Sequence, residues 1–372
     1  MSIFNYIIWS PNPDIIDLGP LVIRWYGLLF ALGFIIGQQI IYYIFKKEGK
    51  PEKDVETITI YMVIATIIGA RLGHVLFYEP GQYLSDPIKI LKIWEGGLAS
   101  HGAAIGILTA IWLYSSYYIN ISFKEFTIKK RKRPGQSFLW VVDKIVIVVA
   151  LGGSLIRLGN FLNSEIVGVE TNSGAGVVFA WDAERIFEHE AYIEDVGFSK
   201  PEADSLAEMI PNPTLMTLTF VERDFDENAI RAFIEGEFKK SLNTNPYASQ
   251  HLKAPQAMPY TLEKQRGRFI ATVALEGIPR HPAQLYESFS SLLIFIFLFL
   301  LWKKKHQVLP EGRIFGIFLV VLFGLRFMYE FIKESQVAFE DELPLNMGQW
   351  LSIPLVIAGI AVLIMTRKKK RE

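Results

Sequence analysis

Ionisable and hydrogen-bonding side chains lie within apolar stretches of this sequence, where charge is costly and usually marks function. They are Arg24, Tyr26, Arg71, His74, His101, Arg157, Asn160, Arg280, His281, Gln284, Tyr286, Glu287, Arg326, Glu330, Asn346 and Gln349. Guanidinium groups bind phosphate through paired hydrogen bonds and keep their charge at any relevant pH. The arginines of this set therefore predict an anionic ligand, and a lipid phosphodiester is the anion that a bilayer offers.

The composition indicates a membrane protein and excludes several kinds of site. Of the 372 residues, 51% are hydrophobic and 20% are charged, against about 25% charged in soluble domains. The formal net charge of +0 leaves no global basic footprint for nucleic acid. The chain has no cysteine, so any reacting thiol must come from the substrate. No Asp, Glu and His residues have metal-ligand spacing, and we expect neither a metal nor another cofactor.

Seven apolar stretches approach the length of about 20 residues that a bilayer core requires. They lie near 20–45, 56–78, 97–118, 138–158, 283–302, 313–332 and 348–366. Basic residues gather in alternate loops, as they do on the cytoplasmic side of membranes, at 46–53, 124–133, 303–305 and 367–371. We therefore predict an all-α polytopic membrane protein of about seven transmembrane helices, with its amino terminus outside and its carboxyl terminus in the cytoplasm.

One long polar segment, 166–276, interrupts the apolar pattern. It contains DENAIRAFIEGEFKK, which predicts a helix with Asp226 as N-cap, and RFIATVAL, which predicts a strand. We expect a small mixed α/β extracytoplasmic domain here, between the fourth and fifth helices. The predicted domains are then 1–165 with helices one to four, 166–276, and 277–372 with helices five to seven and a basic cytoplasmic tail.

In this topology nearly all of the polar residues within the spans fall in the outer half of the bilayer. The pattern indicates a cation-rich cavity that opens at the outer leaflet. A transporter for an anionic solute would explain the arginines equally well, but it predicts polar residues through both halves. A non-enzymatic lipid-binding scaffold is a third alternative, and it leaves His101 and Tyr26 unexplained. Arg24 is as readily a simple interfacial anchor, and Arg326 can pair with Glu330 on the same helix face.

Six stretches resemble the signatures of prolipoprotein diacylglyceryl transferases, in that family's order. They are IRWYG around Tyr26, GARLGHVLFY around Arg71, EGGLASHG ending at His101 and Gly102, RLGNFLNSEIVG from Arg157 to Gly168, RHPAQLYE from Arg280 to Glu287, and GLRFMYEFIKE from Gly324 to Glu334. The sequence departs from the family at Ala103, where a second glycine is usual, and in its longer external segment. The resemblance leaves out most of 169–275.

The resemblance implies a reaction and its partners. The family moves an sn-1,2-diacylglyceryl group from phosphatidylglycerol to the thiol of a lipobox cysteine in a prolipoprotein signal peptide, and it releases glycerol 1-phosphate. It also implies a place in the bacterial inner (cytoplasmic) membrane. A substrate that carries the thiol agrees with a chain that has no cysteine.

The chemistry of this reaction suggests roles for four catalytic residues. Negative charge grows on the phosphate as it leaves the glycerol carbon, and we expect Arg157 and Arg280 to stabilise it. His101 is the expected base for the thiol, with a hydrogen bond to the lipid headgroup as the alternative. Tyr26 is expected to form a hydrogen bond with the phosphate or the ester. The structural alternatives are helix packing for His101 and an interfacial aromatic belt for Tyr26.

The predicted substrate-binding set comprises Arg157, Asn160, Glu165, Arg280, Glu287, Arg71 and Arg326. We expect Glu165 to orient an arginine, because a carboxylate next to the leaving phosphate would otherwise repel it. Asn160 is equally able to cap the end of the fourth span.

Overall fold

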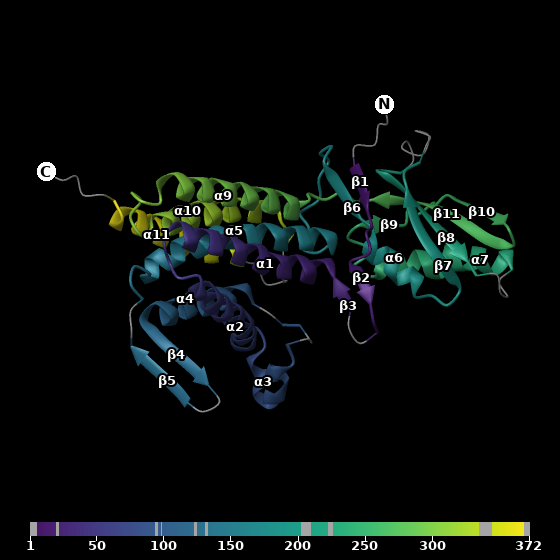
Figure 1. Cartoon of the computed structure of the whole chain (residues 1–372). Coiled ribbons are helices and arrows are strands. Elements are labelled where there is room, and N and C mark those ends of the chain that lie inside the picture. Colours follow the sequence, from purple (N-terminus) through teal and green to yellow (C-terminus); the bar gives the residue numbers. More distant parts are fainter. Residues whose placement is uncertain are drawn as a thin grey trace. The chain divides into compact units, whose positions relative to one another are not determined.

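The structure is a computed structural model, and it describes residues 6–19, 22–93, 96–97, 99–122, 125–130, 133–201, 210–221, 226–334 and 344–367. Some charges that set the predicted topology lie outside these residues, namely Lys124, Arg131, Lys132 and the residues 340–342 and 368–371. The chain divides into two units (Figure 1). The first unit comprises Met1–Leu29, Ile156–Ser288 and Met328–Met347, and the second comprises Phe30–Leu155, Phe289–Phe327 and Gly348–Glu372. Both units combine stretches that are distant in sequence, whereas the three consecutive domains predicted above follow the membrane boundaries and remain a prediction.

Within the described residues, six helices are long and apolar enough to cross a membrane, so the chain is a polytopic membrane protein. They are α1 (Trp25–Lys47), α2 (Lys53–Phe77), α5 (Phe138–Leu162), α9 (Ala283–Lys305), α10 (Arg313–Tyr329) with the 3-10 turn Glu330–Ile332, and α11 (Met347–Met365). The stretch expected to form the third span contains α4 (Ser100–Ser116), which has 17 residues and is shorter than these six. The count of seven spans therefore remains a prediction.

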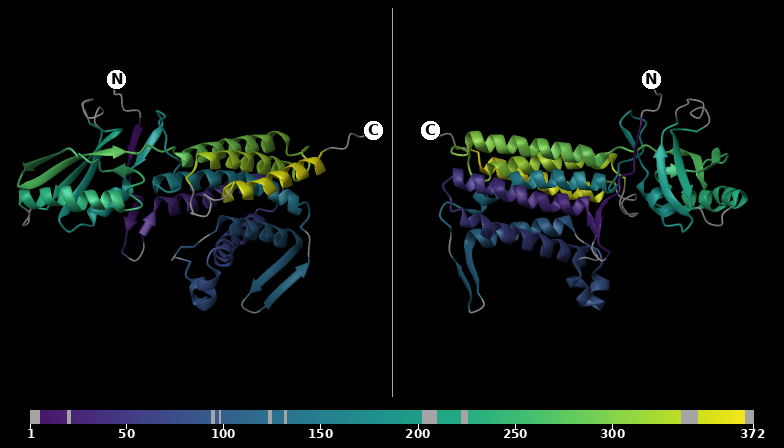
Figure 2. Two further views of the ribbon diagram at one scale, coloured as in Figure 1. Left: turned by 180° about the vertical axis from the view of Figure 1, so that it is seen from behind. Right: turned by 45° about the vertical axis from the view of Figure 1, so that its right-hand side comes forward.

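Within the second unit, α2 and α4 lie side by side (Figures 1 and 2). A Cβ atom at Gly69 would lie 2.5 Å from the Gly102 carbonyl oxygen, and one at Gly73 would lie 2.6 Å from the Gly102 Cα. Small residues allow this backbone approach, which is a common way for helices to associate in membranes. The backbones of these two helices are thus nearly in contact at the start of α4.

Two adjacent charges interrupt the apolar sequence of α5, and the structure gives both of them partners. The Nζ of Lys144 lies 2.9 Å from a carboxylate oxygen of Glu48. Asp143 accepts hydrogen bonds from the backbone nitrogens of Gly312 (2.8 Å) and Phe315 (2.7 Å), so its carboxylate caps the amino end of α10. These contacts explain how a span can contain charges, because each is neutralised or hydrogen-bonded inside the unit.

Shorter elements connect the helices. In the second unit they are α3 (Pro80–Ser85), the 3-10 turn Pro87–Leu91, and the antiparallel pair β4 (Tyr117–Ser122) and β5 (Glu125–Lys130). In the first unit, β2 (Asp14–Asp17) and β3 (Val22–Arg24) form a hairpin that precedes α1. A parallel pair joins β1 (Tyr6–Trp9) to β6 (Gly176–Phe179).

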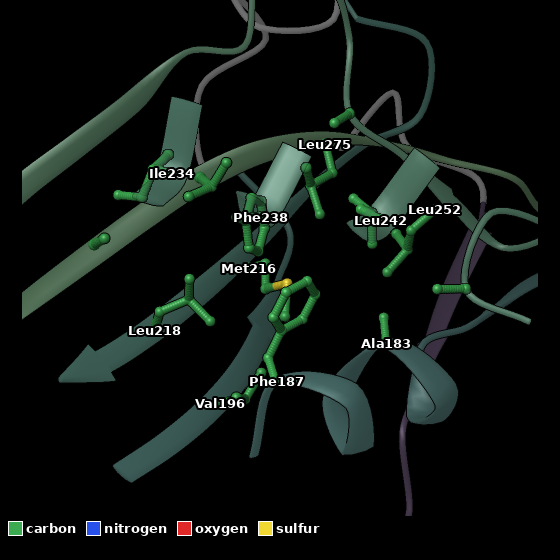
Figure 3. Packing of buried hydrophobic residues seen from close by; sticks show 14 of the residues in the cluster. Ala183, Phe187, Val196, Met216, Leu218, Ile234, Phe238, Leu242, Leu252 and Leu275 are labelled. Atoms are coloured by element: carbon green, nitrogen blue, oxygen red, sulfur yellow. The ribbon is translucent and has the colours of Figure 1, made fainter. Parts of the chain in front are cut away.

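The main sheet of the first unit contains five strands. Its order is β10 (Tyr260–Gln265), β11 (Arg268–Gly277), β8 (Pro213–Phe220) and β7 (Ile193–Ser199), and β9 (Leu252–Lys253) also pairs with β11. The helices that share a core with this sheet are α6 (Trp181–Glu188), α7 (Glu227–Phe233), the π-helical turn Ile234–Phe238 and α8 (Lys239–Thr244). Their apolar side chains and those of the sheet form one buried core, in which Phe187, Met216 and Phe238 meet (Figure 3).

The helix and the strand predicted within 166–276 are both found. Asp226 accepts a hydrogen bond of 2.7 Å from the Ala229 nitrogen and so caps α7. The stretch RFIATVAL lies in β11. The placement of this segment outside the membrane remains a prediction.

Candidate active site

The predicted site residues are divided between the two units. Tyr26, Arg157, Asn160, Glu165, Arg280 and Glu287 lie in the first unit, and Arg71, His101 and Arg326 lie in the second. Each group is described within its own unit.

Arg280 occupies the centre of a small backbone assembly in the first unit. Its backbone exchanges two hydrogen bonds of 2.9 Å with Val177. Its side chain is almost fully buried, and Nε donates to the Gln250 carbonyl at 3.0 Å. Nη1 donates to a carboxylate oxygen of Glu334 at 2.7 Å and to the Gly168 carbonyl at 3.2 Å. Three separate segments of the chain therefore fix the direction of this guanidinium.

A buried histidine, His251, follows the carbonyl that holds Arg280. Burial and, to a smaller degree, the positive charge of Arg280 lower the pKa of His251 to about 3. Its ring centroid lies 5.8 Å from that of Phe179. His251 is thus neutral at pH 7, and Arg280 is the cation of this corner. The sequence offered no signal for Gln250 or His251, because neither belongs to a stretch that resembles the family.

Arg157, near the carboxyl end of α5, meets an acidic residue from another helix. Its Nε lies 2.6 Å from Oε2 of Glu287, in the first turns of α9. The second oxygen of Glu287 lies 2.6 Å from Nζ of Lys333, a nearly buried lysine that follows α10. The structure thus brings together two predicted site residues and adds Lys333, which the sequence analysis did not include in the site.

The carboxylate of Glu165 contacts asparagines. Asn160 and Asn163 each donate a hydrogen bond of 3.2 Å to it, and Gln284 donates to the Glu165 backbone oxygen at 2.6 Å. Within the described residues no ion pair joins Glu165 to an arginine, whereas Glu287 is paired with Arg157. Of the two alternatives for Asn160, capping the helix does not hold, because α5 continues to Leu162, and the substrate contact remains a prediction.

Gly168 lies where three backbone segments cross. Its nitrogen donates to the His281 carbonyl at 2.9 Å, and it pairs with Lys333 in an antiparallel bridge. A Cβ atom here would lie 2.6 Å from the His281 oxygen and 2.7 Å from the Ile332 oxygen. Both atoms belong to backbone that has other partners, so only glycine fits without moving the segments that carry Arg280 and Lys333.

Tyr26 lies in the first turn of α1, which begins at Trp25, and it faces α5. A Cβ atom at Gly159 would lie 2.9 Å from the Tyr26 Cα, so the two helices touch at this glycine. The tyrosine is half-buried, which leaves part of its surface open to a ligand. The neighbouring Arg24 forms an ion pair of 2.9 Å with Asp14 across the β2–β3 hairpin.

Arg71, in the second unit, binds the backbone of a connecting loop. Its guanidinium donates five hydrogen bonds to backbone carbonyls of one connecting loop, those of Lys89, Ile90, Lys92, Gly96 and Gly97. The ring of Tyr83 lies 4.8 Å from the guanidinium carbon. All five N–H groups of an arginine are used in this arrangement. The loop therefore occupies the donors that we expected to bind substrate, and Arg71 has no N–H group left for a phosphate in this arrangement.

His101 lies in the first turn of α4 and contacts aromatic rings. Its ring centroid is 5.2 Å from that of Phe77 and 5.8 Å from that of Tyr78. The side chain is half-buried, so one side remains accessible. Arg326, in α10, is also half-buried. The roles predicted for both residues remain predictions.

Comparison with known proteins identifies the family. The sequence model described as "Prolipoprotein diacylglyceryl transferase" matches residues 13–365. Relatives named phosphatidylglycerol–prolipoprotein diacylglyceryl transferase include that of Tolumonas auensis, which is 34% identical over 98% of this chain and 99% of the relative. That of Chloroherpeton thalassium is 34% identical over 99% and 97%, and that of Porphyromonas gingivalis is 32% identical over 99% and 97%. The chain therefore belongs to the prolipoprotein diacylglyceryl transferase family, as six of its sequence stretches predict.

Proposed function

We propose that this chain transfers the sn-1,2-diacylglyceryl group of phosphatidylglycerol to the lipobox cysteine thiol of a prolipoprotein and releases glycerol 1-phosphate. The observation that carries this proposal is a pair of arginines, each oriented through a carboxylate, in a membrane protein of this family. The names of the relatives support the lipid and the protein substrate. The same names favour this function over the alternative of an anion transporter, which would explain the arginines equally well.

Both arginines retain groups that can receive a phosphate. Glu287 lies 2.6 Å from Nε of Arg157, and the arginine side chain is 18% exposed, so part of the guanidinium is accessible to a ligand. Nη2 of Arg280 lies 3.9 Å from a carboxylate oxygen of Glu170, a largely exposed side chain that a phosphate can displace. Asn160, Glu165 and Arg326 complete the proposed binding set.

The proposed step is a substitution at the glycerol carbon next to the phosphate. The thiolate sulfur forms a bond to this carbon, and the carbon–oxygen bond breaks with its electron pair going to the phosphate oxygen. The thiol proton goes to His101. Arg157 and Arg280 stabilise the charge that grows on the phosphate, and the Tyr26 hydroxyl forms a hydrogen bond with the phosphate or the ester.

The membrane arrangement is part of the proposal. We propose a bacterial inner membrane, seven spans, an extracytoplasmic position for 166–276, and a carboxyl terminus in the cytoplasm. Termini on opposite sides require an odd number of spans, so α4 must cross as the third. Its 17 residues extend about 26 Å as a helix, close to the hydrocarbon core of about 30 Å.

Purified protein incubated with phosphatidylglycerol and a lipobox peptide tests the proposed function. Mass spectrometry should show the peptide with a diacylglyceryl group in thioether linkage, and glycerol 1-phosphate should appear in equal amount. A peptide with serine in place of the lipobox cysteine is the control, because a hydroxyl is a poor nucleophile at neutral pH. Unmodified cysteine peptide with active, lipid-embedded protein would contradict the proposal.

Two single-cysteine variants test the orientation. Asn172→Cys and Gln307→Cys place thiols at exposed positions in a chain whose own background is clean, since it has no cysteine. In intact cells, with the outer membrane permeabilised where one exists, we expect a membrane-impermeant reagent to label Cys at 172 and not at 307. Detergent-solubilised protein, in which both should react, is the control. The opposite labelling would reverse the proposed topology.

Replacing His101 by glutamine tests the proposed base. Glutamine keeps approximate size and hydrogen bonding but cannot take the proton, so turnover should fall at pH 7. It should recover partly as the pH rises to about 8.5, where the free thiol ionises by itself. His189→Gln, at an exposed histidine, is the matched control and should follow the wild type. A constant ratio of variant to wild type at every pH, with saturating lipid, would leave His101 as a headgroup ligand only.

A further inference from the structure

A row of alternating charges extends away from Arg157 inside the first unit. Glu287 lies between two cations, with Oε2 at 2.6 Å from Nε of Arg157 and Oε1 at 2.6 Å from Nζ of Lys333. Lys333 also donates a hydrogen bond of 3.1 Å to a carboxylate oxygen of Glu330. The side chain of Lys333 is only 4% exposed, which is rare for a lysine and requires paired charges.

The position of Lys333 is fixed by backbone contacts. Lys333 pairs with Gly168 in an antiparallel bridge, and the preceding Ile332 carbonyl accepts a hydrogen bond of 3.0 Å from the Val169 nitrogen. The next residue, Glu334, contacts Arg280 at 2.7 Å. Two consecutive side chains therefore act on the two arginines. Glu334 contacts Arg280 directly, and Lys333 is linked to Arg157 through Glu287.

The carboxylate of Glu287 creates an electrostatic problem at a phosphate site. It orients Arg157, but its negative charge repels the lipid phosphodiester and opposes the second charge that the phosphate gains as it leaves. Repulsion between the carboxylate and the phosphate is strong when the two groups are close together and little solvent separates them. A second cation on the far oxygen of Glu287 reduces this repulsion and leaves the ion pair between Glu287 and Arg157 in place.

We propose that Lys333 is a positioning residue for the transfer: it neutralises Glu287, so that Glu287 holds Arg157 at Nε without repelling the lipid phosphate. This inference rests on the proposed binding of the lipid phosphate by Arg157, which we call the phosphate clamp. Lys333 acts through Glu287 and does not touch the reacting atoms.

Three variants in the full-length, lipid-embedded protein test the inference. Lys333→Met removes the charge and should raise KM for phosphatidylglycerol about 10-fold or more, with a smaller fall in kcat, because repulsion acts already on the bound lipid. Lys333→Arg should remain within about 3-fold of the wild type. The double variant Lys333→Met with Glu287→Gln removes both charges, so its KM should fall well below that of Lys333→Met alone. Lys303→Met, at an exposed lysine of α9, is the control.

Each outcome decides between charge and packing. If Lys333 only supports the fold, Lys333→Met should lower kcat or the yield of folded protein without changing KM, and the double variant should be as impaired as the single variants or more so. That pattern would overturn the inference. A variant Arg157→Lys with normal activity would instead overturn the phosphate clamp itself, so the two failures are distinguishable.

Discussion

Replacing Arg157 by lysine is expected to lower turnover by about 10²- to 10³-fold in protein that still folds and inserts. Lysine keeps the positive charge but has a single ammonium group in place of the planar fork. It cannot contact Glu287 at one edge and a phosphate with two further nitrogens. The measurement is the rate of diacylglyceryl transfer at saturating lipid and peptide.

The matched control for this variant is Arg185→Lys. Arg185 lies on α6, is 53% exposed, and has only a long ion pair of 4.0 Å with Asp182. Exposed pairs of this kind contribute little, so turnover should be unchanged. Near-normal turnover of Arg157→Lys, beside an equally active control, would remove Arg157 from the phosphate clamp.

Replacing Gly168 by alanine is expected to reduce transfer by about 10²-fold, although the substitution adds a single methyl group. The added Cβ would lie 2.6 Å from the His281 carbonyl oxygen and 2.7 Å from that of Ile332, so both segments must move apart. Those segments carry Arg280 and Lys333. The expected loss arises from displaced cations, and the transfer assay measures it in protein whose folding is checked by its thermal transition.

Gly197→Ala in β7 is the control for this variant, because a Cβ atom there meets nothing within 4 Å. It should retain full activity and the wild-type melting temperature. Full activity of Gly168→Ala would mean that the crossing of the three segments tolerates a methyl group and does not determine the placement of the arginines.

The apolar spans and the local signals of the inserted segment were predictable from the sequence. Span length and hydropathy depend on consecutive residues, and so do the N-cap at Asp226 and the strand-forming residues of β11. The end of α5 was predicted about one turn too early, since the polar Asn160 looked like a helix end. The helix continues because Asn160 finds a partner in Glu165, which follows in the next turn.

The pairing of charges in the site was not predictable in the same way. Arg280 contacts Gln250 and Gly168, which lie 30 and 112 residues away in sequence, and only the folded backbone brings them together. Lys333 is absent from the predicted site, because its burial and its bridge to Gly168 depend on contacts between distant parts of the chain. Arg71 has the residue type that a phosphate site needs, but five backbone carbonyls of the neighbouring loop accept its hydrogen bonds instead.

The two neighbouring charges of α5 also impose an order on biosynthesis. Glu48, the partner of Lys144, is made before it and is ready when α5 leaves the ribosome. The backbone that Asp143 caps begins at Gly312, which is 169 residues later. At 5–20 residues per second, roughly 8–34 s pass before that partner exists. During this interval the Asp143 carboxylate in α5 lacks the backbone nitrogens from which it later accepts hydrogen bonds. Water or the translocon must therefore solvate it until α10 has been made.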